Sequence, residues 1–155
     1  MRALLQRARV ASVSVIDPES VQARVVGELA APGLVILVGV NTVDGQEQAD
    51  ALAAKVAHLR ILEDETSLVS AGAPALVVSQ FTLYGDARKG RRPSWSAAAR
   101  PEAAEVLYKR FASRLEAEGV HVERGEFGAH MEVSLVNDGP FTLMVDTDDL
   151  AGPRV

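Results

Sequence analysis

The alternation of hydrophobic and polar residues predicts a hairpin near the start of the chain. Residues 11–15 (Ala-Ser-Val-Ser-Val) and 21–25 (Val-Gln-Ala-Arg-Val) carry apolar side chains at every second position, and residues 17–20 have turn composition. This period is that of half-buried strands joined by a turn. Residues 34–40 are apolar on both faces, which predicts a central strand covered on each side, and residues 75–83 predict another buried strand.

Two further stretches repeat apolar residues with the spacing of amphipathic helices. The first covers residues 46–62 and follows polar residues that can cap a helix. The second begins at Pro101, a residue accepted at the first helical position, and ends at Gly119. Residues 85–96 between the helices are polar, basic and glycine-containing, which indicates a surface loop.

The end of the chain predicts two short strands and a tail. Residues 131–135 alternate as a strand, and residues 141–145 return as the last one. Between them Asn137-Asp138-Gly139-Pro140 has the composition of a hairpin turn. The segment after Asp146 is short and acidic, so we expect the tail beyond about residue 147 to fray.

These elements predict a single α/β domain over residues 1–155. Most predicted elements are strands, and two are amphipathic helices. The sequence contains no internal repeat, low-complexity block or linker. We expect mixed β-sheets that form two β layers with a helical layer. A chain of 155 residues with 48% hydrophobic residues can build one compact core.

Composition narrows the possible functions. The sequence contains no cysteine, which excludes disulfides, a thiol nucleophile and cysteine-bound zinc. It has no membrane-length apolar run and no convincing signal peptide, so we expect a cytoplasmic protein without membrane association. The formal net charge of −5 argues against a general DNA-binding surface. Nucleic-acid contact would have to be local, and residues 88–92 form the one basic cluster.

The residues offer no ordinary catalytic constellation. His58, His121 and His130 lie on separate elements without metal-ligand spacing; we expect His58 to be partly buried and structural, and the other two to lie on surface strands. No nucleophile elbow or phosphate-binding loop is present. The carboxylates of residues 63–65 are best explained by a solvated turn. We therefore expect neither a metal nor another cofactor.

Two segments stand out from this background. Ser79-Gln80-Phe81-Thr82 places polar and aromatic groups at the end of a very apolar strand, where rigid scaffolds often hold sites. An edge strand with a hydroxyl on each face is an equally good explanation from composition alone. The second segment is Asn137 to Pro140, for which composition alone favours an ordinary turn.

At these two segments the chain resembles the D-aminoacyl-tRNA deacylase family. The resemblance covers nearly the whole chain, in order and at near-family spacing. Its motifs are Leu5-Gln6-Arg7, Ala11-Ser12-Val13, Gly39-Val40, Leu59-Arg60-Ile61, Val77 to Leu83, Lys89 to Ser94, Leu107-Tyr108, Phe127 to Met131 and Leu135 to Pro140.

The resemblance implies a homodimer in which each subunit lends Gly139-Pro140 to the active site of its neighbour. In the family this peptide bond is cis, and its carbonyl groups face the pocket, where they accept hydrogen bonds from the substrate amino group and leave no room for an L side chain. Arg7 corresponds to an arginine that braces this loop, although a solvated strand residue would look the same. Asn137 belongs to the same loop.

The catalytic part of the resemblance lies at Ser79, Gln80, Phe81 and Thr82. It implies that the N–H groups of Phe81 and Thr82 hold the ester carbonyl as an oxyanion hole does. Thr82 Oγ could also act as a nucleophile, but the sequence supplies no base for it. We favour assistance by the 2′-hydroxyl of the terminal adenosine of the tRNA.

The remaining implied site residues surround this centre. Phe127, Ala129 and Met131 correspond to residues that line or support the pocket, with core packing an equally good explanation. Arg88, Lys89, Arg91 and Arg92 are suited to the phosphates of the tRNA acceptor end, although a merely solubilising loop would look alike.

The chain also departs from the family pattern. The hairpin expected between Asp64 and Ala75 is short, and Val69-Ser70 replace the usual Met-Asn pair, which puts the outer pocket rim in doubt. Phe141 stands where valine is common, and could tighten the loop or fill a dimer interface.

The function implied is hydrolysis of D-aminoacyl-tRNA, with glycyl-tRNA as an achiral second substrate. Two alternatives remain: a non-catalytic nucleic-acid-binding protein on the same fold, and the sister enzymes that remove L-alanine from the wrong tRNA. The Ser79 to Thr82 motif speaks against the sister enzymes.

Overall fold

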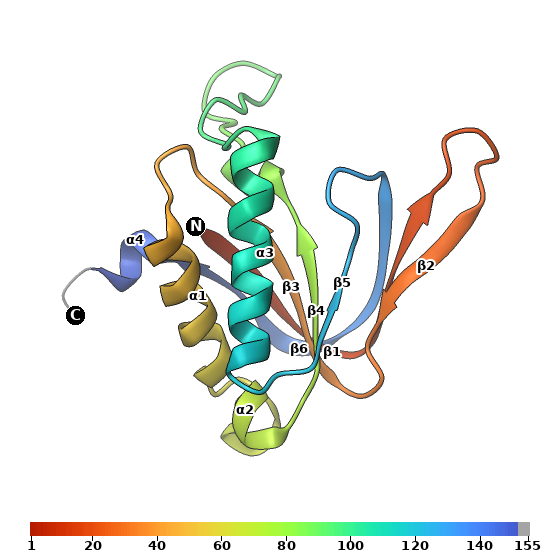
Figure 1. The fold of residues 1–155 in the computed structure, drawn as a ribbon, viewed down its shortest axis with the longest axis vertical. Helices are drawn as coiled ribbons and strands as arrows, with labels where there is room; N and C mark the ends of the chain where they lie inside the picture. The colour runs from red at the N-terminus through yellow and green to blue at the C-terminus, as the bar shows by residue number, and fades with distance from the viewer. Residues whose placement is uncertain (152–155) are drawn as a thin grey trace.

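The structure is a computed structural model that describes residues 1–151, and these residues form one α/β unit (Figure 1). The strands are β1 (Arg2–Ile16), β2 (Ala23–Glu28), β3 (Gly33–Gly39), β4 (Ala75–Ser79), β5 (Val122–Arg124) and β6 (Met131–Asp146). The helices are α1 (Gln46–His58), α2 (Leu68–Ala71), α3 (Pro101–Ala117) and α4 (Thr147–Leu150), with 3-10 turns at Glu63–Glu65 and Phe81–Tyr84.

The six strands form one sheet with mixed parallel and antiparallel pairing, so the mixed pairing is confirmed, whereas the arrangement in two β layers stays a prediction. Their order is β2-β1-β3-β4-β5, and β6 pairs with the other edge of β1. The long strand β1 is antiparallel to β2, β3 and β6, whereas β3, β4 and β5 run parallel to one another. The predicted hairpin of β1 and β2 is confirmed. The parallel part matters most for the site, because its three carboxyl ends meet at one edge of the sheet.

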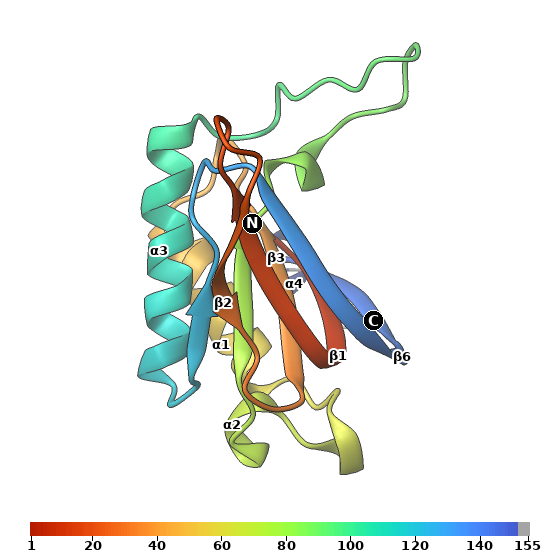
Figure 2. The ribbon, with the colours of Figure 1, turned by 90° about the vertical axis from the view of Figure 1, so that its right-hand side faces the viewer.

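Hydrophobic cores form on both faces of the sheet. Helices α1 and α3 lie side by side over one face (Figures 1 and 2), where Phe111 and Leu52 pack against Ile36 and its neighbours. On the opposite face Val35 and Val13 belong to a second, smaller core. Alternate residues of β3 therefore enter different cores, which explains why residues 34–40 are apolar throughout.

The first predicted helix ends earlier than the sequence suggests. It stops at His58, because Leu59 adopts an extended conformation with ψ of 123°. Ile61 and Leu62 still enter the core, but from an irregular segment. Their apolar side chains continue the helical spacing in the sequence, which is why the predicted helix was too long. The stretch between Asp64 and Ala75 is also not a hairpin, since it contains the 3-10 turn and the short helix α2.

The end of the chain is more ordered than predicted. Instead of two strands around a hairpin turn, β6 is one strand of 16 residues. Asn137 to Pro140 form a bulge in it: from the pair Gln6 with Thr142 to the pair Ala8 with Asn137, β1 advances by two residues and β6 by five. Turn-forming residues suit a bulge as well as a hairpin, so composition could not separate the two.

The predicted fraying after residue 147 is wrong for the residues described. Thr147 to Leu150 form α4, and Thr147 is buried. The Met1 ammonium donates to Thr147 Oγ1 at 2.6 Å and to Asp44 Oδ1 at 2.8 Å, which fixes this end to the sheet. The tail beyond residue 151 lies outside the described residues. Within residues 1–151, no helix has the length and apolar character needed to cross a membrane.

Candidate active site

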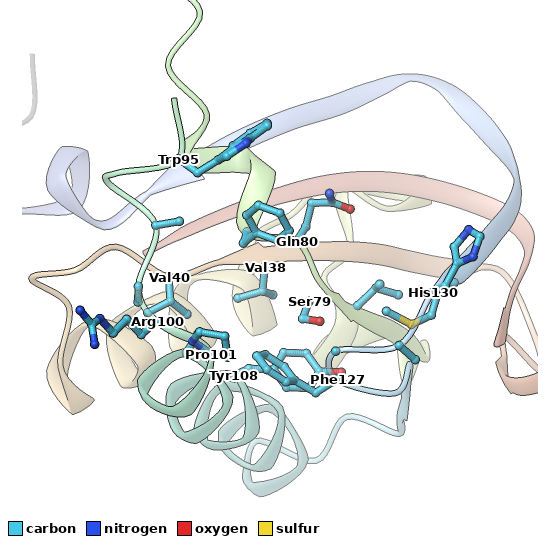
Figure 3. A pocket seen from close by; sticks show the side chains of 18 of the residues that line it. Val38, Val40, Ser79, Gln80, Trp95, Arg100, Pro101, Tyr108, Phe127 and His130 are labelled. Carbon is cyan, nitrogen blue, oxygen red and sulfur yellow. The ribbon is translucent and has the colours of Figure 1, made fainter. Parts of the chain in front are cut away.

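A cavity of about 640 Å³ opens at the carboxyl ends of the three parallel strands (Figure 3). Val38 and Val40 reach it from the end of β3, Ser79 from the end of β4, and the segment 127–130 from the turn after β5. In open α/β sheets ligands bind at this edge, because neighbouring loops diverge there and leave a crevice on a rigid support. The cavity is also within the size range of small-molecule sites.

The inner wall of the cavity is apolar and aromatic. Tyr108 from α3 and Phe127 face each other there, with their ring centroids 5.8 Å apart. The Tyr108 hydroxyl donates to the carbonyl of Val77 at 2.9 Å, and burial raises the pKa of Tyr108 to about 12. Tyr108 is thus a neutral donor at physiological pH that joins α3 to β4, rather than a proton acceptor for catalysis.

Replacing Tyr108 by phenylalanine is expected to lower the free energy of unfolding by about 1 kcal/mol. The loss is small because the Val77 carbonyl keeps a second donor, the N–H of Gly125 at 3.0 Å. The raised pKa of Tyr108 stabilises the fold fully below pH 10, and this contribution declines as the pH rises toward 12. Denaturant unfolding of the unaltered protein and of Tyr108→Phe at pH 8 and pH 11 measures this. The difference between their free energies of unfolding should be smaller at pH 11. An unchanged or larger difference would contradict the role given to the buried, neutral Tyr108 hydroxyl.

The Ser79 to Thr82 segment leaves the sheet as a 3-10 turn, so the strand predicted to reach Leu83 ends at Ser79. The N–H of Gln80 still donates to the carbonyl of Val38 at 2.7 Å, which holds the start of the turn against β3. Strand β4 lies between β3 and β5, so an edge-strand explanation is excluded.

The first two N–H groups of the turn have no acceptor within the described residues. In residues 1–151 neither Phe81 nor Thr82 donates its N–H to another group of the chain, as expected for the first residues of a 3-10 turn. Ser79, Gln80 and Phe81 line the cavity, whereas Thr82 does not. The Thr82 hydroxyl accepts a hydrogen bond from the side-chain amide of Gln80, and an amide cannot activate it as a base.

The Gly139-Pro140 bulge lies outside this cavity, and its peptide bond is cis. Both residues are exposed, and a Cβ built on Gly139 would meet no atom of the described chain within 4 Å. Asn137 is also exposed; its amide donates to the carbonyl of Arg7 at 2.9 Å and to that of Phe141 at 3.3 Å. Asn137 therefore ties the two ends of the bulge to β1.

Arg7 contacts the bulge through its guanidinium. Its Nε donates to the carbonyl of Asp138 at 3.2 Å and lies 3.1 Å from the carboxylate of that residue, while Nη2 reaches the carbonyl of Gly139 at 3.5 Å. The guanidinium also stacks over the ring of Phe141, 4.4 Å from its centroid. Phe141 thus contacts the arginine that bonds to the loop, whereas its place in a dimer interface stays a prediction.

The structure separates the site residues into three groups. Phe127, Ala129 and Met131 line the cavity together with the end of β4. Arg7, Asn137, Gly139 and Pro140 form the bulge region, and Arg88, Lys89, Arg91 and Arg92 lie on the exposed loop that projects beyond α3 (Figure 2). Val69 and Ser70 lie in α2, away from the cavity, so their departure from the family does not alter its rim.

The histidines differ partly from expectation. His58 is exposed rather than partly buried, and its Nε2 lies 2.9 Å from a carboxylate oxygen of Glu118. His121 is exposed just before β5, while His130 lies at the cavity mouth immediately before β6 (Figure 3). No group of three or more histidine, aspartate or glutamate side chains in residues 1–151 is arranged to hold a metal ion.

Sequence reasoning missed much of the cavity wall. Most of the additional lining residues come from three places, the end of β3, the segment before α3 and α3 itself: Val38, Val40, Trp95, Ala98, Ala99, Arg100, Pro101, Ala104 and Tyr108. The others are Val78 in β4, Gly128 and His130 before β6, and Val133 in β6. Most are apolar and indistinguishable from core residues by pattern. Trp95, the only tryptophan, in an otherwise polar loop, was the one available signal.

This fold and cavity define an α/β domain with a cavity of small-molecule size at the carboxyl edge of its parallel strands. The model of the family described as D-Tyr-tRNA(Tyr) deacylase matches residues 4–146. Two relatives, each named D-aminoacyl-tRNA deacylase, are 61% identical in Micrococcus luteus and 53% identical in Kocuria rhizophila, and both alignments cover 99% of each chain. The chain belongs to this family of deacylase enzymes.

Solved structures agree with this assignment of the fold. A structure titled c-Myc DNA Unwinding Element Binding Protein is 31% identical, with a TM-score of 0.81 over 94% of this chain and 98% of the other. A second, titled as a structural analysis of a probable eukaryotic D-amino acid tRNA deacylase, is 18% identical, with a TM-score of 0.78 over 93% and 97%. The second likeness bears on the fold alone.

Proposed function

We propose that this protein hydrolyses the ester of D-aminoacyl-tRNA in the cytoplasm, releasing the free amino acid and tRNA. The proposed site is shared by two subunits of a homodimer: one subunit supplies the cavity, and its partner supplies Gly139-Pro140. The single observation that carries the proposal is the separation of these two parts, because within residues 1–151 the exposed bulge does not line the cavity of its own chain. The family relationship supplies the reaction.

Strand β6 supports the proposed dimer. Within residues 1–151 it pairs with β1 alone, which leaves its other edge unpaired over 16 residues, and its Val136 and Met144 are 52% and 46% exposed. A long, unpaired and partly apolar edge strand is a liability that proteins usually cover. Association of two chains at this region would cover it and would bring the bulge of each chain to the other.

The proposed chemistry requires little from side chains. A water oxygen attacks the ester carbonyl carbon, the bond to the ribose 3′ oxygen breaks, and that oxygen takes up a proton. The N–H groups of Phe81 and Thr82, which donate to no other group within residues 1–151, would stabilise the negative charge on the carbonyl oxygen. The 2′-hydroxyl of the terminal adenosine assists the attack of the water. Correct positioning of the activated ester supplies the rest of the rate enhancement, without a metal.

Chirality would be read by the backbone of the bulge. Its carbonyls accept hydrogen bonds from the substrate amino group, and the same groups occupy the volume that an L side chain needs. Arg7 supports this arrangement through its bonds to the carbonyls of Asp138 and Gly139. Glycyl-tRNA presents no side chain, so it would pass the filter and be hydrolysed too.

A deacylation assay tests the proposal. Purified protein is incubated with D-Tyr-tRNA, L-Tyr-tRNA and a D-Tyr-tRNA that ends in 2′-deoxyadenosine, each with and without a chelator. The first is expected to be hydrolysed, the second spared, and the third cleaved at least about 100-fold more slowly, with no effect of the chelator. Equal rates on D-Tyr-tRNA and L-Tyr-tRNA would contradict selection for the D-enantiomer. An unchanged rate on the 2′-deoxyadenosine substrate would contradict assistance by the 2′-hydroxyl.

The alternative is a non-catalytic nucleic-acid-binding protein on the same fold. The name of the 31% identical structure, a DNA-unwinding-element binding protein, favours keeping this alternative. The net charge of −5 disfavours extended contact with DNA. Absence of hydrolysis on every substrate, together with tight binding of duplex DNA, would favour it over the enzyme.

A further inference from the structure

Trp95 lies between the cavity and the basic tip of the loop that precedes α3. The loop is closed at its base by two hydrogen bonds between the backbones of Asp86 and Ser94, each 2.8 Å long. Trp95 follows this closure directly and lines the cavity, while the exposed residues 87–93 extend outward (Figure 2). The indole is thus at the exit from the cavity toward the tip of the loop (Figure 3).

The indole is held in place but its surface is not covered. It packs edge-to-face on Phe81, with centroids 5.4 Å apart, and against Gly85, where even a Cβ would come within 2.6 Å of the indole. Trp95 nevertheless remains 43% exposed and Phe81 56% exposed. A tryptophan with only a packing role would bury its large apolar surface.

The segment of the loop that extends outward from the indole is positively charged. The tip of the loop carries four basic residues, and one of them, Arg88, pairs at 2.7 Å with Asp86 at the base of the loop. Lys89, Arg91 and Arg92 have no carboxylate within 4 Å in the part of the chain that the structure describes. An exposed aromatic ring beside free cations is the combination that binds single-stranded nucleic acid, through base stacking and phosphate contacts.

We propose that Trp95 stacks on the nucleobase that precedes the aminoacylated adenosine in the single-stranded 3′ end of the tRNA. This inference rests on the proposed function, which places the terminal adenosine and its ester in the cavity. A strand that leaves the cavity toward the basic tip must pass the indole, and its next base meets the exposed ring. Trp95 is then a positioning residue that reads a flat base without distinguishing its sequence.

The test compares two substrates, D-Tyr-tRNA and D-tyrosyl-adenosine, which lacks every nucleotide before the last. Trp95→Leu is expected to raise KM for D-Tyr-tRNA about tenfold, consistent with the energy of one base stack, and to leave kcat unchanged. Its kinetics on D-tyrosyl-adenosine should equal those of the unaltered protein. Trp95→Phe should recover most of the affinity, and the neighbouring Ser96→Ala should change neither substrate.

Each other outcome counts against a specific claim. An equal loss on both substrates, or no change on either, would overturn the stacking role, because a ring that only supports Phe81 affects both reactions alike. If the unaltered protein hydrolyses neither substrate, the proposed function itself is wrong.

Fluorescence gives a second, independent readout. Trp95 is the only tryptophan, so the intrinsic emission of the protein reports on it alone. The trinucleotide CCA is expected to quench this emission in a saturable way, whereas adenosine and inorganic tripolyphosphate should not. Equal quenching by adenosine would place the terminal base on Trp95 instead, and equal quenching by tripolyphosphate would reduce the loop to a phosphate site.

Discussion

Gly139→Ala is expected to leave the fold intact and to lower the rate of D-Tyr-tRNA hydrolysis by about 100-fold. Within its own chain, a methyl group at this position meets no atom within 4 Å, so the free energy of unfolding should hardly change. In the proposed dimer the same methyl group projects into the cavity of the partner subunit. There it would displace the substrate amino group by about the size of a methyl group.

Gly45→Ala is the matched control for this experiment. A Cβ at Gly45 also makes only an ordinary contact, with its nearest neighbour, Gln48 Oε1, at 3.5 Å, and it lies at the start of α1, outside the cavity. This variant should keep both stability and activity. Full activity of Gly139→Ala would remove the bulge from the active site, and unfolding of that variant would show that the glycine serves the fold of its own chain.

Arg7→Ala is expected to lower kcat/KM on D-Tyr-tRNA by a factor of about 10 to 100 and to weaken the rejection of L-Tyr-tRNA. The Arg7 side chain is only 17% exposed, and its guanidinium contacts two carbonyls, a carboxylate and the ring of Phe141. A charged hydrogen bond contributes about 1.5 to 3 kcal/mol, so its loss should release the bulge. The measurement is the ratio of kcat/KM on D-Tyr-tRNA to kcat/KM on L-Tyr-tRNA.

Two further variants separate bracing from charge. Arg7→Lys keeps the charge but loses the planar fork that reaches both carbonyls, so we expect an intermediate loss. Arg9→Ala removes a neighbouring arginine that is 72% exposed and only 4.0 Å from the same Asp138 carboxylate. It should behave as the unaltered protein. If Arg9→Ala and Arg7→Ala are equally impaired, net charge rather than bracing explains the effect.

The sequence predicted those features that a local pattern determines. The hairpin of β1 and β2, the buried strand β3 and the limits of α3 follow from periodicity and from Pro101 and Gly119. Hydrophobic periodicity and composition do not identify Gly139-Pro140 or the Ser79 to Thr82 segment as site residues. Both were proposed as parts of the active site from the resemblance to the family. Composition alone had favoured an ordinary turn for the first of these.

The remaining features depend on packing between distant segments. Turn-forming residues at 137–140 are compatible with a hairpin, but β1 continues past them and pairs with both flanks, which makes a bulge. Thr147 is ordered because it meets the ammonium of Met1. Val40 and Ala104 line the cavity only because the ends of β3 and α3 converge there. Contacts between segments that are distant in the sequence produce no periodic pattern of residues, so they cannot be predicted from it.

The sharing of one site by two chains can be tested with a second variant that damages the cavity. Phe81→Pro removes one of the two free N–H groups, and proline is accepted at the first position of a helical turn. The preceding Gln80 lies outside the α-helical region, which proline disfavours for the residue before it, with φ of −147° and ψ of 81°. Loss of an oxyanion donor should cost about 100-fold or more in kcat.

The decisive measurement is the activity of mixed dimers that contain one Gly139→Ala chain and one Phe81→Pro chain, isolated through different C-terminal tags because the Met1 ammonium is buried. Each variant alone is expected to be nearly inactive on D-Tyr-tRNA. The mixed dimer contains one intact cavity facing one intact bulge, so we expect about half of the unaltered activity. Activity no higher than the mean of the two parent variants would contradict a site built from two chains.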